Sequence, residues 1–117
     1  MANAAVPKSL KLEIEHKGST ALVHCHGRLV YEECDLLYDN VRPLIPDSKR
    51  IILDLTDLIF IDSIGLGTLV RLYVSAKSAG SCLELINLGK QIRHVLGITH
   101  LLSLFGDMCE KGVAVRF

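Results

Sequence analysis

The residue types best suited to chemistry stand in the stretch IDSIGLGTL, from Ile61 to Leu69. It follows the almost entirely apolar run RIILDLTDLIF, so burial accounts for the neighbours but not for the Asp62 carboxylate or the Ser63 hydroxyl. A strand that gives way to a helix here would leave unpaired backbone N–H groups at the helix start, and such groups favour anions. Ser63 is also a good N-cap residue, because its hydroxyl can accept a hydrogen bond from one of these groups.

Two glycines, Gly65 and Gly67, fall in the first turn of the expected helix. Glycine weakens a helix relative to other residues, because the unfolded chain has more conformational freedom to lose. Their presence therefore predicts that some other group approaches the backbone closely at this point.

A second cluster of reactive types is HCH, in which a strand would place His24 and His26 on one face and Cys25 on the other. A metal site would need further ligands, such as Cys34 or His94, that the spacing does not supply. Alternating histidines on a strand are more often surface or interface residues, so we predict no metal site.

Signatures of enzymes are weak. DSIGLG is not the G-x-S-x-G elbow of hydrolases, and no order of Asp and His singles out a catalytic triad. The stretch GKQIRHVLG lacks the remainder of a phosphate-binding loop, and Lys90 and Arg93 fit a solvated helix face. We therefore predict no catalytic residue and no cofactor.

Composition favours one soluble domain. The chain has 117 residues, half of them hydrophobic, with 13 basic and 13 acidic residues that cancel. Without a basic excess, nucleic acid is not expected as a partner. Charged residues interrupt the apolar runs before a membrane span would be complete, so direct insertion into a membrane is not expected either. Four cysteines without a paired motif suggest free thiols, and no signal peptide is expected, so we predict a cytoplasmic protein. Residues 1–8 read as a flexible tail and residues 9–117 as a single domain.

Hydrophobic periodicity predicts the order ββαβαβα, followed by one or two short elements. The expected strands are 10–15 and 21–26 as an antiparallel hairpin, 50–56 buried on both faces, and 82–87. Three helices are expected in this order. The first bends near Pro43, and its buried residues are Leu36, Leu37, Val41, Leu44 and Ile45. The second covers 65–77 with Leu66, Leu69, Val70, Tyr73 and Val74 buried, and the third is a short helix around 92–96. The stretch LLSLF follows as a last strand or a helix-to-strand turn. The end DMCEKGVAVRF is ambiguous, a helix by its first half and a strand by VAVRF.

The two βαβ crossovers require parallel pairs, joined right-handed. The fold class is therefore α/β: a mixed sheet of about four to five strands, largely parallel with an antiparallel edge hairpin, packed with about four to five helices.

At this point the sequence resembles the STAS domain family, and most closely its single-domain bacterial anti-sigma factor antagonists. The resemblance covers nearly the whole chain. It is carried by HGRL at 26–29, the strand IILDLT, the junction DSIGLG and the following stretch CLELINLGKQIRHVLGITHLLSLF.

The resemblance implies a phosphorylation switch at Ser63, the serine directly after the aspartate. In the family, the unphosphorylated form binds a GHKL-type protein that is both anti-sigma factor and serine kinase, which releases the sigma factor. Phosphorylation ends this binding, and a PP2C-type phosphatase resets it. The partner-binding residues implied here are Asp62, Ser63, Ile64, Gly65, Leu66 and Gly67.

One residue departs from the pattern, since many relatives have Ser or Thr where this chain has Ile64. Any modification should then fall on Ser63 alone. The departure also leaves an alternative open, in which the chain is a non-switching STAS scaffold or a subunit associated with a lipid-transporting ABC system.

Overall fold

The computed structural model describes residues 10–98 and 115–116 of the chain, in which five strands form one sheet of order β1-β2-β3-β4-β5. The strands are β1 (Leu10–Lys17), β2 (Thr20–Leu29), β3 (Arg50–Ile61), β4 (Cys82–Ile86) and β5 (Val115–Arg116). β1 and β2 pair antiparallel, and every other neighbouring pair is parallel. This confirms the predicted α/β fold with its antiparallel edge hairpin, and β5 supports the strand alternative for the end of the chain.

Three α-helices lie in the described part of the chain: α1 (Cys34–Val41), α2 (Ser63–Ser78) and α3 (Lys90–Ile98). This is fewer than the four to five predicted, and the stretch LLSLF lies outside the described residues. α1 is flanked by single 3-10 turns, Tyr31–Glu33 before it and Arg42–Leu44 after it. The second turn contains Pro43, where the sequence predicted the helix to bend or end.

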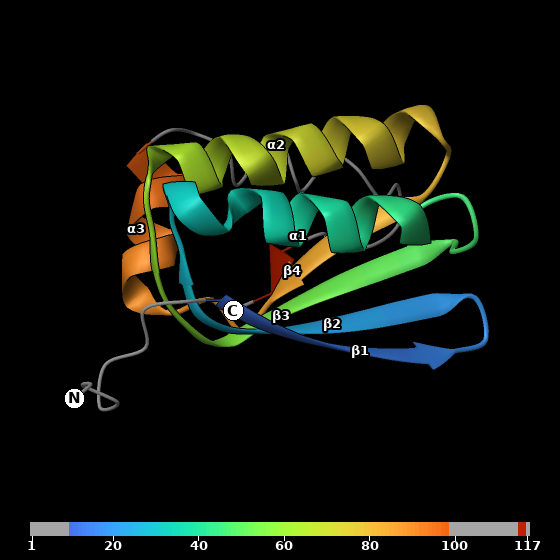
Figure 1. The fold of residues 1–117 in the computed structure, drawn as a ribbon, viewed down its shortest axis with the longest axis horizontal. Coiled ribbons are helices and arrows are strands. Elements are labelled where there is room, and N and C mark those ends of the chain that lie inside the picture. Colours follow the sequence, from blue (N-terminus) through green and yellow to red (C-terminus); the bar gives the residue numbers. More distant parts are fainter. Residues whose placement is uncertain (1–9, 99–114, 117) are drawn as a thin grey trace.

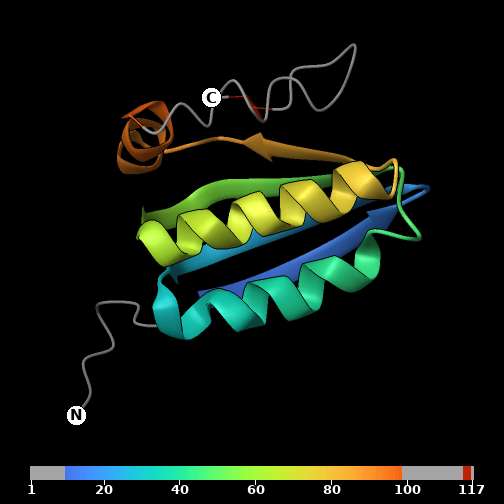
Figure 2. The same ribbon diagram turned by 90° about the horizontal axis from the view of Figure 1, so that it is seen from above.

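α1 and α2 lie side by side on one face of the sheet, and α3 lies at the end of the sheet near the start of α2 (Figures 1 and 2). The strand β3 was expected to be buried on both faces, and this is wrong. Ile51 and Leu53 are fully buried beneath the helices, whereas Ile52 and Asp54 on the opposite face are only partly buried. Both helices that cover the sheet pack on the same side of it, so the strand is central but has only one fully buried face.

The core forms between that face and the two helices. Two residues that were predicted on the inner faces of the helices are not part of it. Leu36 is 40% exposed and Val74 is 54% exposed, although both were expected inside. Leu72 and Ala76 are instead fully buried on α2. Because α2 contacts α1 as well as the sheet, its buried arc is turned relative to the stripe that periodicity alone suggests.

Candidate functional site

The candidate site is the junction between β3 and α2, where the apolar strand ends at Ile61 and the helix begins at Ser63. Asp62 between them has extended backbone geometry, with φ −103° and ψ −177°, as N-cap residues do. Its Oδ1 accepts a hydrogen bond of 2.7 Å from the Gly65 N–H. The N-cap is therefore Asp62, and the expectation that Ser63 caps the helix is wrong by one position.

Ser63 therefore has no capping role in α2. As the first residue of the helix it is exposed, and within the part of the chain that the structure describes its hydroxyl makes no hydrogen bond. A side chain that does not cap the helix can be modified without removing the cap. The hydroxyl also lies beside the unpaired N–H groups of the first turn, which attract negative charge.

Asp62 also fastens the junction to the loop that follows β2. Its Oδ2 accepts a hydrogen bond of 3.1 Å from the Tyr31 N–H, and its own N–H donates to the Leu29 carbonyl at 3.3 Å. Asp62 therefore accepts two backbone N–H groups, one from the helix and one from the loop. One carboxylate thus holds both the helix start and the neighbouring loop.

The two glycines of the motif have different reasons to be there. A Cβ on Gly65 would lie 2.3 Å from the Leu29 carbonyl oxygen and 2.9 Å from its Cγ, so only glycine lets α2 approach β2 this closely. The predicted close approach is confirmed here, and the approaching group is the chain's own backbone. Gly67 is exposed, and a Cβ there would meet nothing within 4 Å.

The predicted partner-binding residues divide by exposure. Ser63, Ile64 and Gly67 face outward, with Ile64 50% exposed, whereas Gly65 and Leu66 are buried. Leu69, expected on the inner face of the helix, is fully buried in the core.

Tyr31 is a surface residue of the site that sequence reasoning missed. It is 70% exposed and lines a hollow of about 310 Å³ together with Ile64. The available signal was an aromatic residue two positions after the end of β2 that does not fit the apolar spacing of the next helix. The other residues lining this hollow are Glu32, Cys34, Asp35, Thr68 and Arg71.

The thiols of the described residues offer no nucleophile here. Burial raises the pKa of Cys34, whose Sγ donates to the Val30 carbonyl at 3.2 Å, and raises the pKa of Cys25 to about 12. Cys82 is disulfide-bonded, so the expectation of four free thiols is wrong for that residue.

The two histidines of HCH lie on the sheet face away from α1 and α2, each between two carboxylates. His24 contacts Glu15 through Nε2 at 2.9 Å and Asp54 through Nδ1 at 3.2 Å. His26 contacts Glu13 and Asp57 at 3.3 and 3.0 Å in the same manner. These contacts link β1, β2 and β3, and none of them involves Cys34 or His94. Among the described residues, no group of three or more potential ligands is arranged to hold a metal ion.

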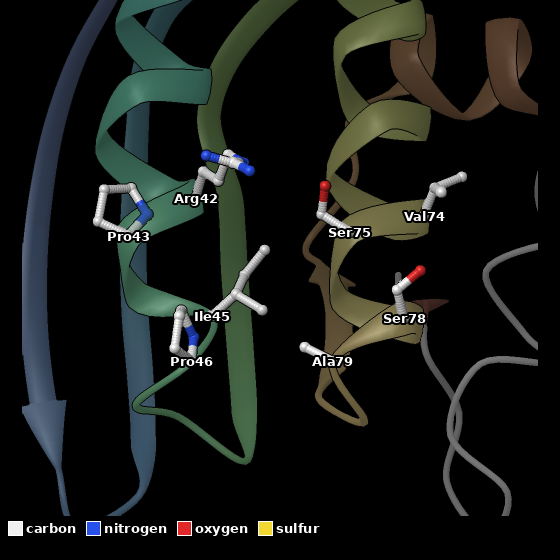
Figure 3. Close-up of a pocket in the computed structure, with 8 residues that line it drawn as sticks. All are labelled: Arg42, Pro43, Ile45, Pro46, Val74, Ser75, Ser78 and Ala79. Atoms are coloured by element: carbon white, nitrogen blue, oxygen red, sulfur yellow. The ribbon is translucent and has the colours of Figure 1, made fainter.

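A separate groove lies at the opposite end of the helices (Figure 3). It has a volume of about 560 Å³ and is lined by Arg42, Pro43, Ile45, Pro46, Val74, Ser75, Ser78 and Ala79. Since α2 has 16 residues, with a rise of about 1.5 Å each, the groove is roughly 20 Å from the junction and forms no part of it.

Comparison with protein-family models matches residues 11–113 to the STAS domain. The chain therefore belongs to the STAS domain family. Within residues 10–98 and 115–116, no helix combines the length and the apolar character needed to cross a membrane.

Several solved structures have a similar fold. An anti-sigma factor antagonist from Mycobacterium paratuberculosis is 20% identical, with a TM-score of 0.76 and 86% of each chain covered. The phosphorylated form of the Bacillus cell-fate determinant SpoIIAA is 18% identical, with a TM-score of 0.67, and the match covers 86% of this chain and 94% of that one. The murine anion transporter Slc26a9 is 17% identical, with a TM-score of 0.69, over 86% of this chain and 16% of the transporter. The fold occurs in antagonists and in part of a transporter alike, so it does not by itself define a function.

Proposed function

We propose that this protein is an anti-sigma factor antagonist switched by phosphorylation at Ser63. In its unphosphorylated form it binds a GHKL-type anti-sigma factor with serine kinase activity, which releases the sigma factor. A PP2C-type phosphatase restores this form. The protein itself acts by binding, in the cytoplasm, and not as an enzyme.

The observation that carries the proposal is the exposure of Ser63 beside a cap that does not depend on it. Both Asp62 oxygens accept backbone N–H groups, of Gly65 and Tyr31, so the helix start stays closed when Ser63 changes. A phosphate on the hydroxyl would add about −1.5 to −2 charges at neutral pH. The positive end of the α2 dipole can hold that charge, so the fold persists.

The same phosphate would disrupt a protein interface at the junction. Ile64 and Tyr31 give the exposed surface beside Ser63 an apolar character, at 50% and 70% exposure. A partner that covers these side chains would exclude water from Ser63 as well. Burying a phosphate dianion without a matching cation is costly, so such a partner would bind the neutral serine and reject its phosphorylated form.

Affinity capture from the native cytoplasm, read by mass spectrometry, tests the proposal. The baits are wild type, Ser63→Ala, Ser63→Asp and the matched control Ser78→Asp, which puts the same charge on an exposed serine near the other end of α2. Wild type, Ser63→Ala and Ser78→Asp should retain a GHKL-type kinase, and Ser63→Asp should lose it.

The alternative assignments predict a different pattern. A non-switching scaffold, or a subunit associated with a lipid-transporting ABC system, would hold its partners equally with all four baits. Equal capture of transporter or scaffold proteins by wild type and Ser63→Asp would therefore overturn the phosphorylation switch.

A further inference from the structure

Among the described residues, the end of β3 has no strand neighbour on one of its sides. β4 pairs with β3 only as far as Asp54, which lies opposite Ile86. β3 continues to Ile61 because β2 still pairs with it on the other side, where Leu29 lies opposite Ile61. On the β4 side, α3 contacts β3 in place of a strand.

One side chain of α3 supplies the hydrogen bonds that a strand would have made. Oε1 of Gln91 accepts from the Ile61 N–H at 3.0 Å, and Nε2 of Gln91 donates to the Ile61 carbonyl at 3.0 Å. A neighbouring strand would satisfy both groups with its own backbone. Ile61 is only 1% exposed, so without Gln91 its N–H and carbonyl would lose these partners in a region that offers little water.

Ile61 is also the last strand residue before the candidate site. On the β2 side, the N–H of Asp62 donates to the Leu29 carbonyl at 3.3 Å. The chain is thus held from both sides immediately before the Asp62 carboxylate closes the first turn of α2 through the Gly65 N–H.

We propose that Gln91 is a positioning residue for the Ser63 junction. Its amide fixes the backbone of Ile61 and so sets the direction in which Asp62 caps α2 and Ser63 leaves the strand. We call the two hydrogen bonds between Gln91 and Ile61 the clamp. The importance of the clamp for phosphorylation rests on the function proposed above, whereas the hydrogen bonds themselves do not depend on it.

The variant Gln91→Met tests the clamp, because methionine has a similar length and lacks both hydrogen bonds. Lys90→Met is the matched control, an exposed neighbour on the same helix. Amide hydrogen exchange by NMR should be about tenfold faster at Ile61 in Gln91→Met, as expected for the loss of one buried hydrogen bond. The amides of Ile51 and Leu53, in the core of the same strand, should exchange as in wild type.

The Gly65 amide reports whether the clamp reaches the site. Its chemical shift and its exchange rate depend on the bond to Asp62, so both should change in Gln91→Met and stay unchanged in Lys90→Met. Unaltered exchange at Ile61 would overturn the clamp. Faster exchange at Ile61 with an unaltered Gly65 amide would overturn the positioning role.

Kinetics with a kinase captured in the experiment above add a functional readout. Phosphorylation of Ser63 should show a several-fold lower kcat in Gln91→Met with KM near that of wild type, since the partner surface is intact and only the orientation of the serine is less defined. An unchanged kcat would overturn the positioning role in phosphorylation. If no kinase is captured, the proposed function fails, and the amides of Ile61 and Gly65 still decide the structural inference.

Discussion

At the scale of single residues, Asp62 is the side chain on which the junction depends. Its two oxygens bind N–H groups of Gly65, in α2, and of Tyr31, in the turn after β2. The local motif indicated a polar cap, yet the choice between Asp62 and Ser63 depended on where the strand ended. Ser63 is therefore left exposed by the same geometry that makes Asp62 indispensable.

Replacing Asp62 by Ala should lower the free energy of unfolding by about 1–2 kcal/mol, since the N-cap bond of α2 is lost. Ser63→Ala should change the free energy of unfolding by less than about 0.5 kcal/mol, because Ser63 is exposed and does not cap the helix. Urea denaturation of both variants checks this. A larger loss in Ser63→Ala than in Asp62→Ala would show that the serine caps the helix after all.

His24 should make the stability of the protein depend on pH. Its hydrogen bond to Glu15 raises its pKa above the ordinary 6.5, burial opposes the increase, and the Asp54 carboxylate adds to it. Because the folded state holds the proton more tightly, this contribution is complete below about pH 6.5 and is lost as pH rises through the higher pKa of the folded protein.

The measurement is urea denaturation of wild type and His24→Gln between roughly pH 5.5 and 8.5. The stability advantage of wild type over His24→Gln should shrink as pH rises. His16→Gln, at an exposed position of β1, is the control. A constant difference between wild type and His24→Gln at every pH would contradict the contact with the two carboxylates as the source of the effect.

At the scale of elements, α2 is placed by its contact with the end of β2. The Leu29 carbonyl receives the Asp62 N–H and also occupies the space that a Cβ on Gly65 would need. Gly65 is thus required by the packing of the helix against the strand. Gly67, two residues later on the same helix, has open space around it.

The two glycines therefore predict opposite effects of the same substitution. Gly65→Ala should destabilise the protein by about 3 kcal/mol, because the methyl group meets backbone that cannot move aside without displacing the helix. Gly67→Ala should stabilise it by about 0.5–1 kcal/mol, because alanine favours the helix and touches nothing. Thermal and urea unfolding measure both, and equal effects of the two variants would refute the close approach to Leu29.

At the scale of the whole molecule, the two ends of the helical layer are different surfaces. The end with Ser63 carries exposed Ile64 and Tyr31, whereas the other end carries the groove beside Val74 (Figure 3). The proposed function uses the first surface only. A partner bound there would leave the groove uncovered.

Variants at the two ends should therefore show which of the two surfaces binds the partner. Tyr31→Ser and Ile64→Ser should each weaken capture of the kinase about tenfold or more, as loss of a central apolar contact does. Val74→Ser, which removes a similarly exposed apolar side chain at the other end, should bind as wild type. Weaker binding by Val74→Ser alone would place the interface on the groove.

Sequence reasoning predicted the order of the elements, the edge hairpin and the junction at Asp62 and Ser63, because these depend on local patterns. Each of these features is determined by a few neighbouring residues. The features are the alternation of apolar residues in β1 and β2, the start of a helix after a polar pair, and glycine in the first turn of the helix. The resemblance to STAS domains rested on the same local stretches.

The tertiary structure alone decided which groups meet at the site. Tyr31 reaches Asp62 across 31 positions of the chain, and Gln91 reaches Ile61 across 30. The covered face of β3 and the turned face of α2 likewise depend on where distant helices pack. Hydrophobic periodicity in the sequence indicates which residues are buried, but it does not indicate which distant segment packs against them. The partners of Asp62, Gly65 and Ile61 therefore emerged only from the folded chain.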